Sequence, residues 1–96
     1  MLEKVNLPAA AKQTGGLFRY AKVGQLNDHM LTVLQGENRT LDFHIHEQSD
    51  ELFYVIEGRF VIELDDGMIH LESGEMIIIP KGTRHRPVVT TRRVAC

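Results

Sequence analysis

The chain has 96 residues, 43% of them hydrophobic and 25% charged, which suits one globular domain and leaves no room for a second. Its formal net charge of -2 gives no electrostatic reason to bind nucleic acid or an anionic membrane. The single cysteine, Cys96, excludes an internal disulfide, and no stretch approaches the roughly 20 apolar residues of a membrane span or the apolar core of a signal peptide. We therefore expect a cytoplasmic protein with neither a nucleic-acid nor a membrane partner.

The expected elements begin after a short N-terminal arm. Residues 1–16 are interrupted by Pro8 and by the glycine pair at 15–16, so we expect them to be loosely structured. From residue 17 onward, short runs of Val, Ile, Phe, Leu and Thr are broken by Gly, Asn and Asp about every 8 to 10 residues, which is typical of an all-β sandwich or barrel. The expected domain covers residues 17–96, with strands at 18–23, 30–34, 41–46, 52–56, 59–64, 68–71, 76–79 and 88–95.

Three turns separate the later strands. The Glu-Gly pair at 57–58 suits a two-residue hairpin, because glycine adopts positive φ angles without strain, and the Asp-Asp-Gly sequence at 65–67 suits a three-residue one. The Pro-Lys-Gly sequence at 80–82 ends the strand before it, since proline cannot donate a ladder hydrogen bond. Two antiparallel hairpins are therefore expected.

Three histidines and one glutamate carry the chemistry. His44 and His46 stand two residues apart in an expected strand, so both imidazoles point to one face, about 7 Å apart at the backbone. Glu51 follows a turn at 47–50, and His85 follows the turn at 80–82, where a neighbouring strand could deliver a third imidazole. Each histidine alone is best explained by local hydrogen bonding. Together they offer a ligand set suited to Mn, Fe, Co, Ni, Cu or Zn and poor for Ca or Mg.

These spacings resemble the two motifs of the cupin family. The first motif is H-x-H, a Glu after four residues and a Gly after six more; the second is a Gly, five residues, Pro-x-Gly, two residues and a His. The matching positions are His44, His46, Glu51 and Gly58 in the first motif and Gly74, Pro80, Gly82 and His85 in the second. The fifteen residues between the motifs resemble the spacing of small single-domain cupins. Asn38 and Val89 depart from the family, which usually has a glycine and an asparagine there.

The resemblance implies a conical or jelly-roll β-barrel of two antiparallel sheets. It also implies one divalent transition metal per chain, held by the three histidines and Glu51 and facing a pocket. Coordination positions left free would permit Lewis-acid or oxygen chemistry. We expect an enzyme of dioxygenase, isomerase, lyase or decarboxylase type that acts on a small polar or anionic molecule. A non-catalytic module that binds or senses a small molecule through its metal is the alternative, and a purely structural metal site comes third.

Three further side chains are candidates for binding the ligand. Arg84 and Arg86 flank His85, and alternation is expected to bring one of them, not both, to the pocket, where it would pair with an anion; a solvated rim is the plainer explanation. Phe53 stands in phase with Glu51 and could form the pocket floor, although core packing explains it equally well.

The segment around the first two histidines also bears on assembly. Its apolar residues, at 41, 43 and 45, point away from the histidine side and must be covered by the other strands, by the arm at 1–16 or by a second copy of the chain. We expect a homodimer, as the resemblance also implies.

Overall fold

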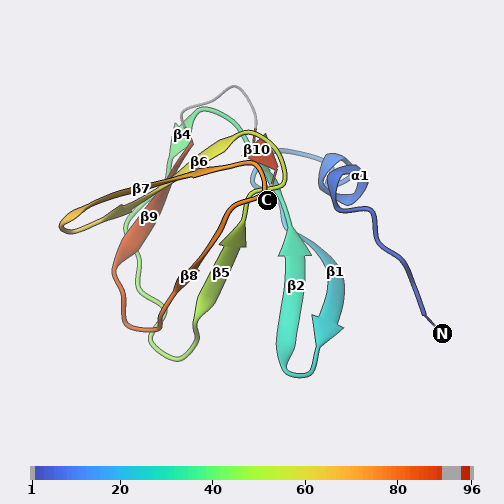
Figure 1. Ribbon diagram of the computed structural model, residues 1–96, viewed down its shortest axis with the longest axis horizontal. Coiled ribbons are helices and arrows are strands. Elements are labelled where there is room, and N and C mark those ends of the chain that lie inside the picture. The colour runs from blue at the N-terminus through green and yellow to red at the C-terminus, as the bar shows by residue number, and fades with distance from the viewer. Residues whose placement is uncertain (1, 90–93, 96) are drawn as a thin grey trace.

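The computed structural model describes residues 2–89 and 94–95, which form a short helix and a series of antiparallel strands (Figure 1). The helix is α1 (Leu7–Lys12). The strands are β1 (Ala21–Leu26), β2 (His29–Val33), β3 (Gln35–Gly36), β4 (Arg39–Thr40), β5 (Glu51–Tyr54), β6 (Arg59–Leu64), β7 (Gly67–Glu72), β8 (Met76–Ile79), β9 (His85–Val89) and β10 (Val94–Ala95). Within this part of the chain, no helix is long and apolar enough to cross a membrane.

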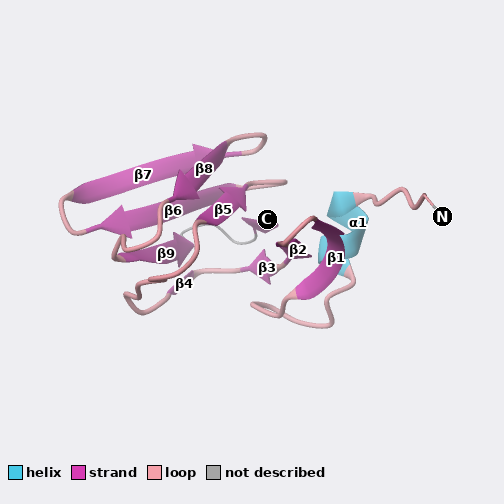
Figure 2. Cartoon of the chain, turned by 90° about the horizontal axis from the view of Figure 1, so that it is seen from below, coloured by secondary structure: helices cyan, strands magenta, loops and turns pink. Residues whose placement is uncertain are grey.

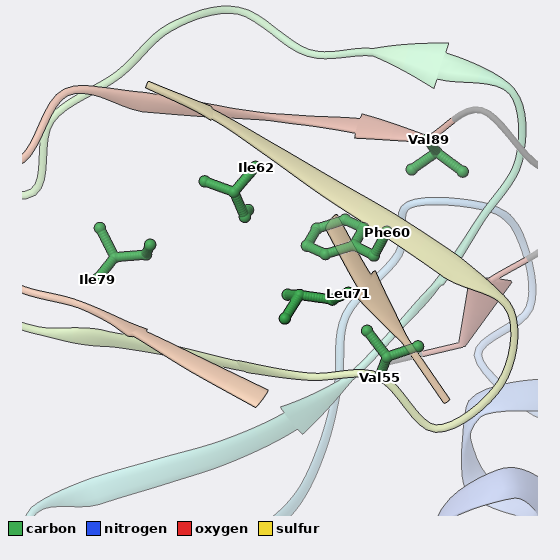
Figure 3. Close-up of a cluster of buried hydrophobic side chains, with 6 residues drawn as sticks. All are labelled: Val55, Phe60, Ile62, Leu71, Ile79 and Val89. Carbon is green, nitrogen blue, oxygen red and sulfur yellow. The ribbon is translucent and has the colours of Figure 1, made fainter. Parts of the chain in front are cut away.

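Two antiparallel sheets enclose the main core. The larger sheet has the strand order β4-β9-β6-β7, and β5 pairs with β8 in the smaller one. Six buried side chains from both sheets and the adjoining turn meet between the strands in Figure 3. They are Val55, Phe60, Ile62, Leu71, Ile79 and Val89. This arrangement confirms the predicted all-β fold, a jelly-roll barrel of antiparallel sheets. Besides the two sheets that enclose the core, β1 pairs with β2 and β3 pairs with β10 in two small sheets.

The N-terminal segment is more ordered than we expected. Residues 7–12 form α1, in which Pro8 occupies the first turn, where its missing N–H leaves no helical hydrogen bond unmade. The side chain of Asn6 caps this helix by accepting from the N–H of Ala9 at 3.0 Å. Ala11 and Val33 are buried in a second small cluster, which joins α1 to the β1-β2 hairpin at one end of the molecule (Figure 1 and Figure 2). Pro8 therefore helps to start a helix and does not interrupt one.

The segment 41–46 is not the regular strand that its alternating pattern predicts. Its strand pairing is a single bridge between His44 and His85. The N–H of Leu41 donates to the carbonyl of Pro87 at 3.0 Å, but proline has no N–H with which to donate a bond in return, so the ladder is interrupted there. The segment therefore does not join the sheet along its length.

Several predicted strand bounds also move. The predicted strand 18–23 is β1 at Ala21–Leu26, because Phe18 has a φ of 57°, a left-handed conformation that does not fit a strand. The predicted strand 88–95 divides into β9 and β10, and its residues 90–93 lie outside the described residues. Asn38, which stands at the glycine position of the cupin motif, has a φ of 38°, and asparagine tolerates such a conformation better than most residues.

The turns differ from the predicted hairpins in two places. Gly58 has the expected positive φ, 93°, but β5 and β6 do not pair with each other; the turn carries the chain from the smaller sheet to the larger one. Between β6 and β7 the hairpin is confirmed, with a two-residue loop in place of the predicted three-residue loop, because Leu64 pairs directly with Gly67. A hydrogen bond from the N–H of Thr83 to the carbonyl of Pro80 closes the turn after β8.

Candidate metal centre

Four side chains singled out from the sequence converge where β5 begins. His44, His46, Glu51 and His85 each offer one ligand atom, and these atoms all lie within 4.8 Å of one another. Glu51 is the first residue of β5 and His85 the first residue of β9, so the group joins the smaller sheet to the larger one. His44 and His46 come from the extended segment between β4 and β5.

The backbone sets the positions of two of these histidines. His44 and His85 exchange both backbone hydrogen bonds, at 2.9 and 3.0 Å, which holds their Cα atoms directly opposite each other. Their ring centroids lie 4.4 Å apart, and the ring of His46 lies 5.0 Å from that of His44. Three imidazoles therefore meet within one small volume, with the ring of His44 edge on to the other two.

Backbone carbonyls orient two of the imidazole rings. Nδ1 of His44 lies 3.0 Å from the carbonyl oxygen of Asp42, and Nδ1 of His85 lies 2.9 Å from that of Thr83. A carbonyl oxygen can only accept, so each Nδ1 carries the proton and donates. In the neutral rings, Nε2 is left with its lone pair free to bind a metal.

The carboxylate of Glu51 faces the Nε2 atoms of His46 and His85. Its Oε1 lies 3.0 Å from Nε2 of His85, and its Oε2 lies 3.4 Å from Nε2 of His46. A carboxylate oxygen and an imidazole lone pair are both acceptors, so this contact needs a proton or a cation between them. A divalent transition metal would satisfy the lone pairs and the carboxylate together, and the residues present therefore fit such an ion.

Burial is uneven across this cluster. The side chain of His85 is 1% exposed, whereas those of Glu51 and His46 are 32% and 44% exposed. Phe53 is partly buried beside the cluster, with its ring centroid 6.3 Å from that of His85 and 5.2 Å from that of the core residue Phe60. The cluster is thus closed on the side of His85 and Phe53 and open to solvent on the side of His46.

The two arginines beside His85 form a separate group. Both guanidinium groups lie over the ring of Phe43, at 3.9 Å for Arg84 and 4.3 Å for Arg86. Arg84 pairs with Asp65, and Arg86 pairs with Glu63. Contrary to our expectation, alternation does not separate the two arginines, because residues two positions apart on an extended chain share a face. In the structure they share the face opposite to that of His85.

Three anchoring hydrogen bonds were not predicted from the sequence. In two of them, the carbonyl two residues before a histidine accepts from Nδ1 of His44 or of His85. In the third, the side chain of Asp50 accepts from the N–H of Lys81, 31 positions along the chain. An acidic residue next to a candidate ligand is a weak signal, and only the fold brings Asp50 to its partner.

Comparisons with known proteins agree with this geometry. The model of the Cupin domain family matches residues 29–96. The protein YdbB of Bacillus subtilis is 37% identical over 89 residues, which cover 90% of this chain and 76% of YdbB. A 3-hydroxyanthranilate 3,4-dioxygenase of Jannaschia sp. is 36% identical over 64 residues, 62% of this chain and 35% of that enzyme. The crystal structure of a cupin-2 domain containing protein from Shewanella frigidimarina superposes with a TM-score of 0.86 at 27% identity, covering 95% of this chain and 89% of the other.

Proposed function

The chain belongs to the cupin family, and from this we propose that it holds one divalent transition metal through His44, His46, Glu51 and His85 and uses it to bind and transform a small polar or anionic molecule. The observation that carries the proposal is the approach of Glu51 to Nε2 of His85, at 3.0 Å, in a ring that already donates through Nδ1. Without a shared cation or proton this contact would be repulsive.

The proposed metal is Mn, Fe, Ni, Co, Cu or Zn. Such an ion supplies Lewis-acid polarisation and, where it is redox-active, access to oxygen chemistry. The chain's own residues orient and shield the site. The carbonyls of Asp42 and Thr83 hold two imidazoles in their tautomers, and Phe53 would give a bound molecule an apolar wall. His46 and Glu51 leave the open side through which that molecule would enter.

We place oxygenase chemistry first among the dioxygenase, isomerase, lyase and decarboxylase classes. The support is the similarity to 3-hydroxyanthranilate 3,4-dioxygenase, of which this chain matches 35% of the length. This similarity supports an oxygenase reaction. For the substrate we propose a small molecule with a carboxylate or a phenol. Arg84 or Arg86 could bind its anionic group only after leaving a carboxylate partner and the ring of Phe43.

The test starts from protein purified without added metal. Its metal content is measured, and the protein is then offered 3-hydroxyanthranilate, simple phenolic acids and small sugar acids while oxygen uptake and product formation are followed. We expect about one transition-metal ion per chain and turnover of a member of this panel. Saturable binding without product would favour the non-catalytic module, and an absence of stoichiometric metal would contradict the proposal.

We also propose that the chain forms a homodimer. On the outer face of the β5-β8 sheet, Leu52 lies opposite Ile78 and Tyr54 opposite Met76, and all four are between 41% and 54% exposed. Phe43, in the segment expected to need a cover, is instead covered by Arg84 and Arg86 of the same chain. A second copy would therefore cover the β5-β8 face. The cytoplasmic location stays a prediction, which cell fractionation would check.

A further inference from the structure

The turn that precedes His85 has two backbone N–H groups that are not used in its own hydrogen bonding. Residues 80–83 form a four-residue turn closed by the bond from the N–H of Thr83 to the carbonyl of Pro80, at 3.2 Å. Gly82, the third residue, has a φ of +84°, while Lys81 is not among the positive-φ residues, which is the pattern of a type II turn. Such a turn uses the N–H of its fourth residue and leaves those of its second and third residues, Lys81 and Gly82, without a partner inside the turn.

Both spare amides are bonded by the loop that carries two of the proposed ligands. The N–H of Lys81 donates to Oδ1 of Asp50 at 2.9 Å, and the N–H of Gly82 donates to the carbonyl of His46 at 2.8 Å. In Figure 1 the loop before β5 and the turn after β8 lie side by side. The acceptors stand immediately before Glu51 and at His46 itself, so these two bonds join the segments that bear three of the four clustered side chains.

The same turn reaches the buried imidazole. Its last residue, Thr83, accepts through its carbonyl oxygen from Nδ1 of His85 at 2.9 Å. The ring of His85 is buried and turns its Nε2 toward Glu51. A displacement of the turn would therefore rotate or release the imidazole whose lone pair is aimed at the proposed metal.

We propose that Asp50 is a positioning residue for the metal centre: its carboxylate holds the turn 80–83 so that the carbonyl of Thr83 directs Nε2 of His85 toward Glu51. The inference rests on the proposed metal function and adds to it a residue that does not touch the ion. The N–H of Lys81 needs an acceptor oxygen at the position of Oδ1 of Asp50, and an asparagine side chain would also offer one. This hydrogen bond joins the loop that precedes Glu51 to the turn that precedes His85.

The experiment compares Co²⁺ affinity and the visible absorption of the Co²⁺-loaded protein across matched variants. Asp50→Ala removes the acceptor, and Asp50→Asn keeps an acceptor oxygen and removes the charge. Glu47→Gln is the control, because Glu47 is an exposed acid of the same loop for which no polar contact is observed in the described residues. We expect Asp50→Ala to weaken Co²⁺ binding about tenfold, the usual cost of losing a group that orients a ligand, and to change the absorption bands. Asp50→Asn and Glu47→Gln should stay within about threefold of wild type, as expected for an exposed charge.

A second pair of variants removes the donor. Lys81→Pro deletes the N–H at a turn position where proline is favoured, while Lys81→Ala changes the same side chain and keeps the N–H. Lys81→Pro should weaken Co²⁺ binding as much as Asp50→Ala does, Lys81→Ala should not, and the double variant Asp50→Ala, Lys81→Pro should lose no more than either alone. These variants decide the question even if Asp50→Ala fails to fold.

The results that would contradict this inference differ from those that would contradict the proposed metal function. If Asp50→Ala binds Co²⁺ like Glu47→Gln, or if Asp50→Asn loses as much as Asp50→Ala, the hydrogen bond does not position His85 and the inference is wrong, with the metal centre itself intact. If wild type binds no Co²⁺ while remaining folded, the proposed function and this inference fail together. Melting temperatures in EDTA supply the remaining control, because a role confined to folding would lower them in Asp50→Ala without changing the absorption of the loaded protein.

Discussion

Replacing His46 by Ala should remove the metal's contribution to stability and little else. A ligand that binds only the folded chain stabilises it by RT ln(1 + [L]/Kd), about 2.7 kcal/mol when the metal is present at about 100 times the wild-type Kd. A variant with 100-fold weaker binding would gain only about 0.4 kcal/mol under the same conditions. For a domain of this size, the difference corresponds to a melting temperature about 10 to 20 °C lower.

The structure predicts that this difference disappears when the metal is removed. The side chain of His46 is 44% exposed, and substitutions of such residues usually change stability by no more than about 0.5 kcal/mol. In EDTA, wild type and His46→Ala should therefore melt within about 3 °C of each other. His70→Ala is the matched control, because His70 is exposed and lies outside the cluster, and it should behave like wild type with and without metal.

The assay is thermal unfolding by circular dichroism, with metal content measured on the same samples. Two results would refute the reasoning. The first is stoichiometric metal retained by a His44→Ala, His46→Ala double variant. The second is a melting difference between wild type and His46→Ala that persists in EDTA, because it would show that His46 stabilises the chain by packing and not through an ion.

Three other predictions follow from burial and contacts. Ile62→Ala should lower the free energy of unfolding by about 2 to 5 kcal/mol in urea titrations, because the side chain is fully buried in the main core. A smaller loss would mean that the core around Ile62 is not closely packed. Arg86→Gln should lower the free energy of unfolding by about 1 kcal/mol, because Arg86 and Glu63 are only 31% and 22% exposed. Arg84→Gln should leave it nearly unchanged, because Arg84 and Asp65 are 47% and 64% exposed. Normal stability with a specific loss of ligand binding would show that the arginines bind the ligand. Ile78→Glu should turn the proposed dimer into a monomer by light scattering without changing metal content, and a wild type that is monomeric at micromolar concentration would contradict the dimer.

Short runs rich in β-branched and other apolar residues that end at a defined turn could be predicted closely from the sequence. The predicted ranges 59–64 and 76–79 coincide with β6 and β8. The grouping of the three histidines with Glu51 was expected from the resemblance to the two cupin motifs. Alternation gives only the shared face of His44 and His46, which a short stretch of sequence largely determines.

Pairing between strands could not be predicted in the same way. The alternation in 41–46 predicts a strand, but this segment makes only a single bridge, because Pro87 on the neighbouring strand lacks the N–H needed for a ladder. The turn at 57–58 has the composition of a hairpin, yet it connects two sheets. The bond from Lys81 to Asp50 joins residues 31 positions apart, and its existence depends on the packing of the whole barrel.

The placement of the cluster links its chemistry to the stability of the fold. Glu51 begins β5 in the smaller sheet and His85 begins β9 in the larger one, and the main core lies between the same two sheets. An ion bound by both side chains would connect the sheets in the folded chain alone, and a contribution of about 2.7 kcal/mol is a large share of the roughly 5 to 15 kcal/mol that holds a typical domain together. This role also accounts for the uneven burial. His85 is buried because it stands where the sheets meet, whereas His46 lies on a segment outside both sheets and can remain exposed.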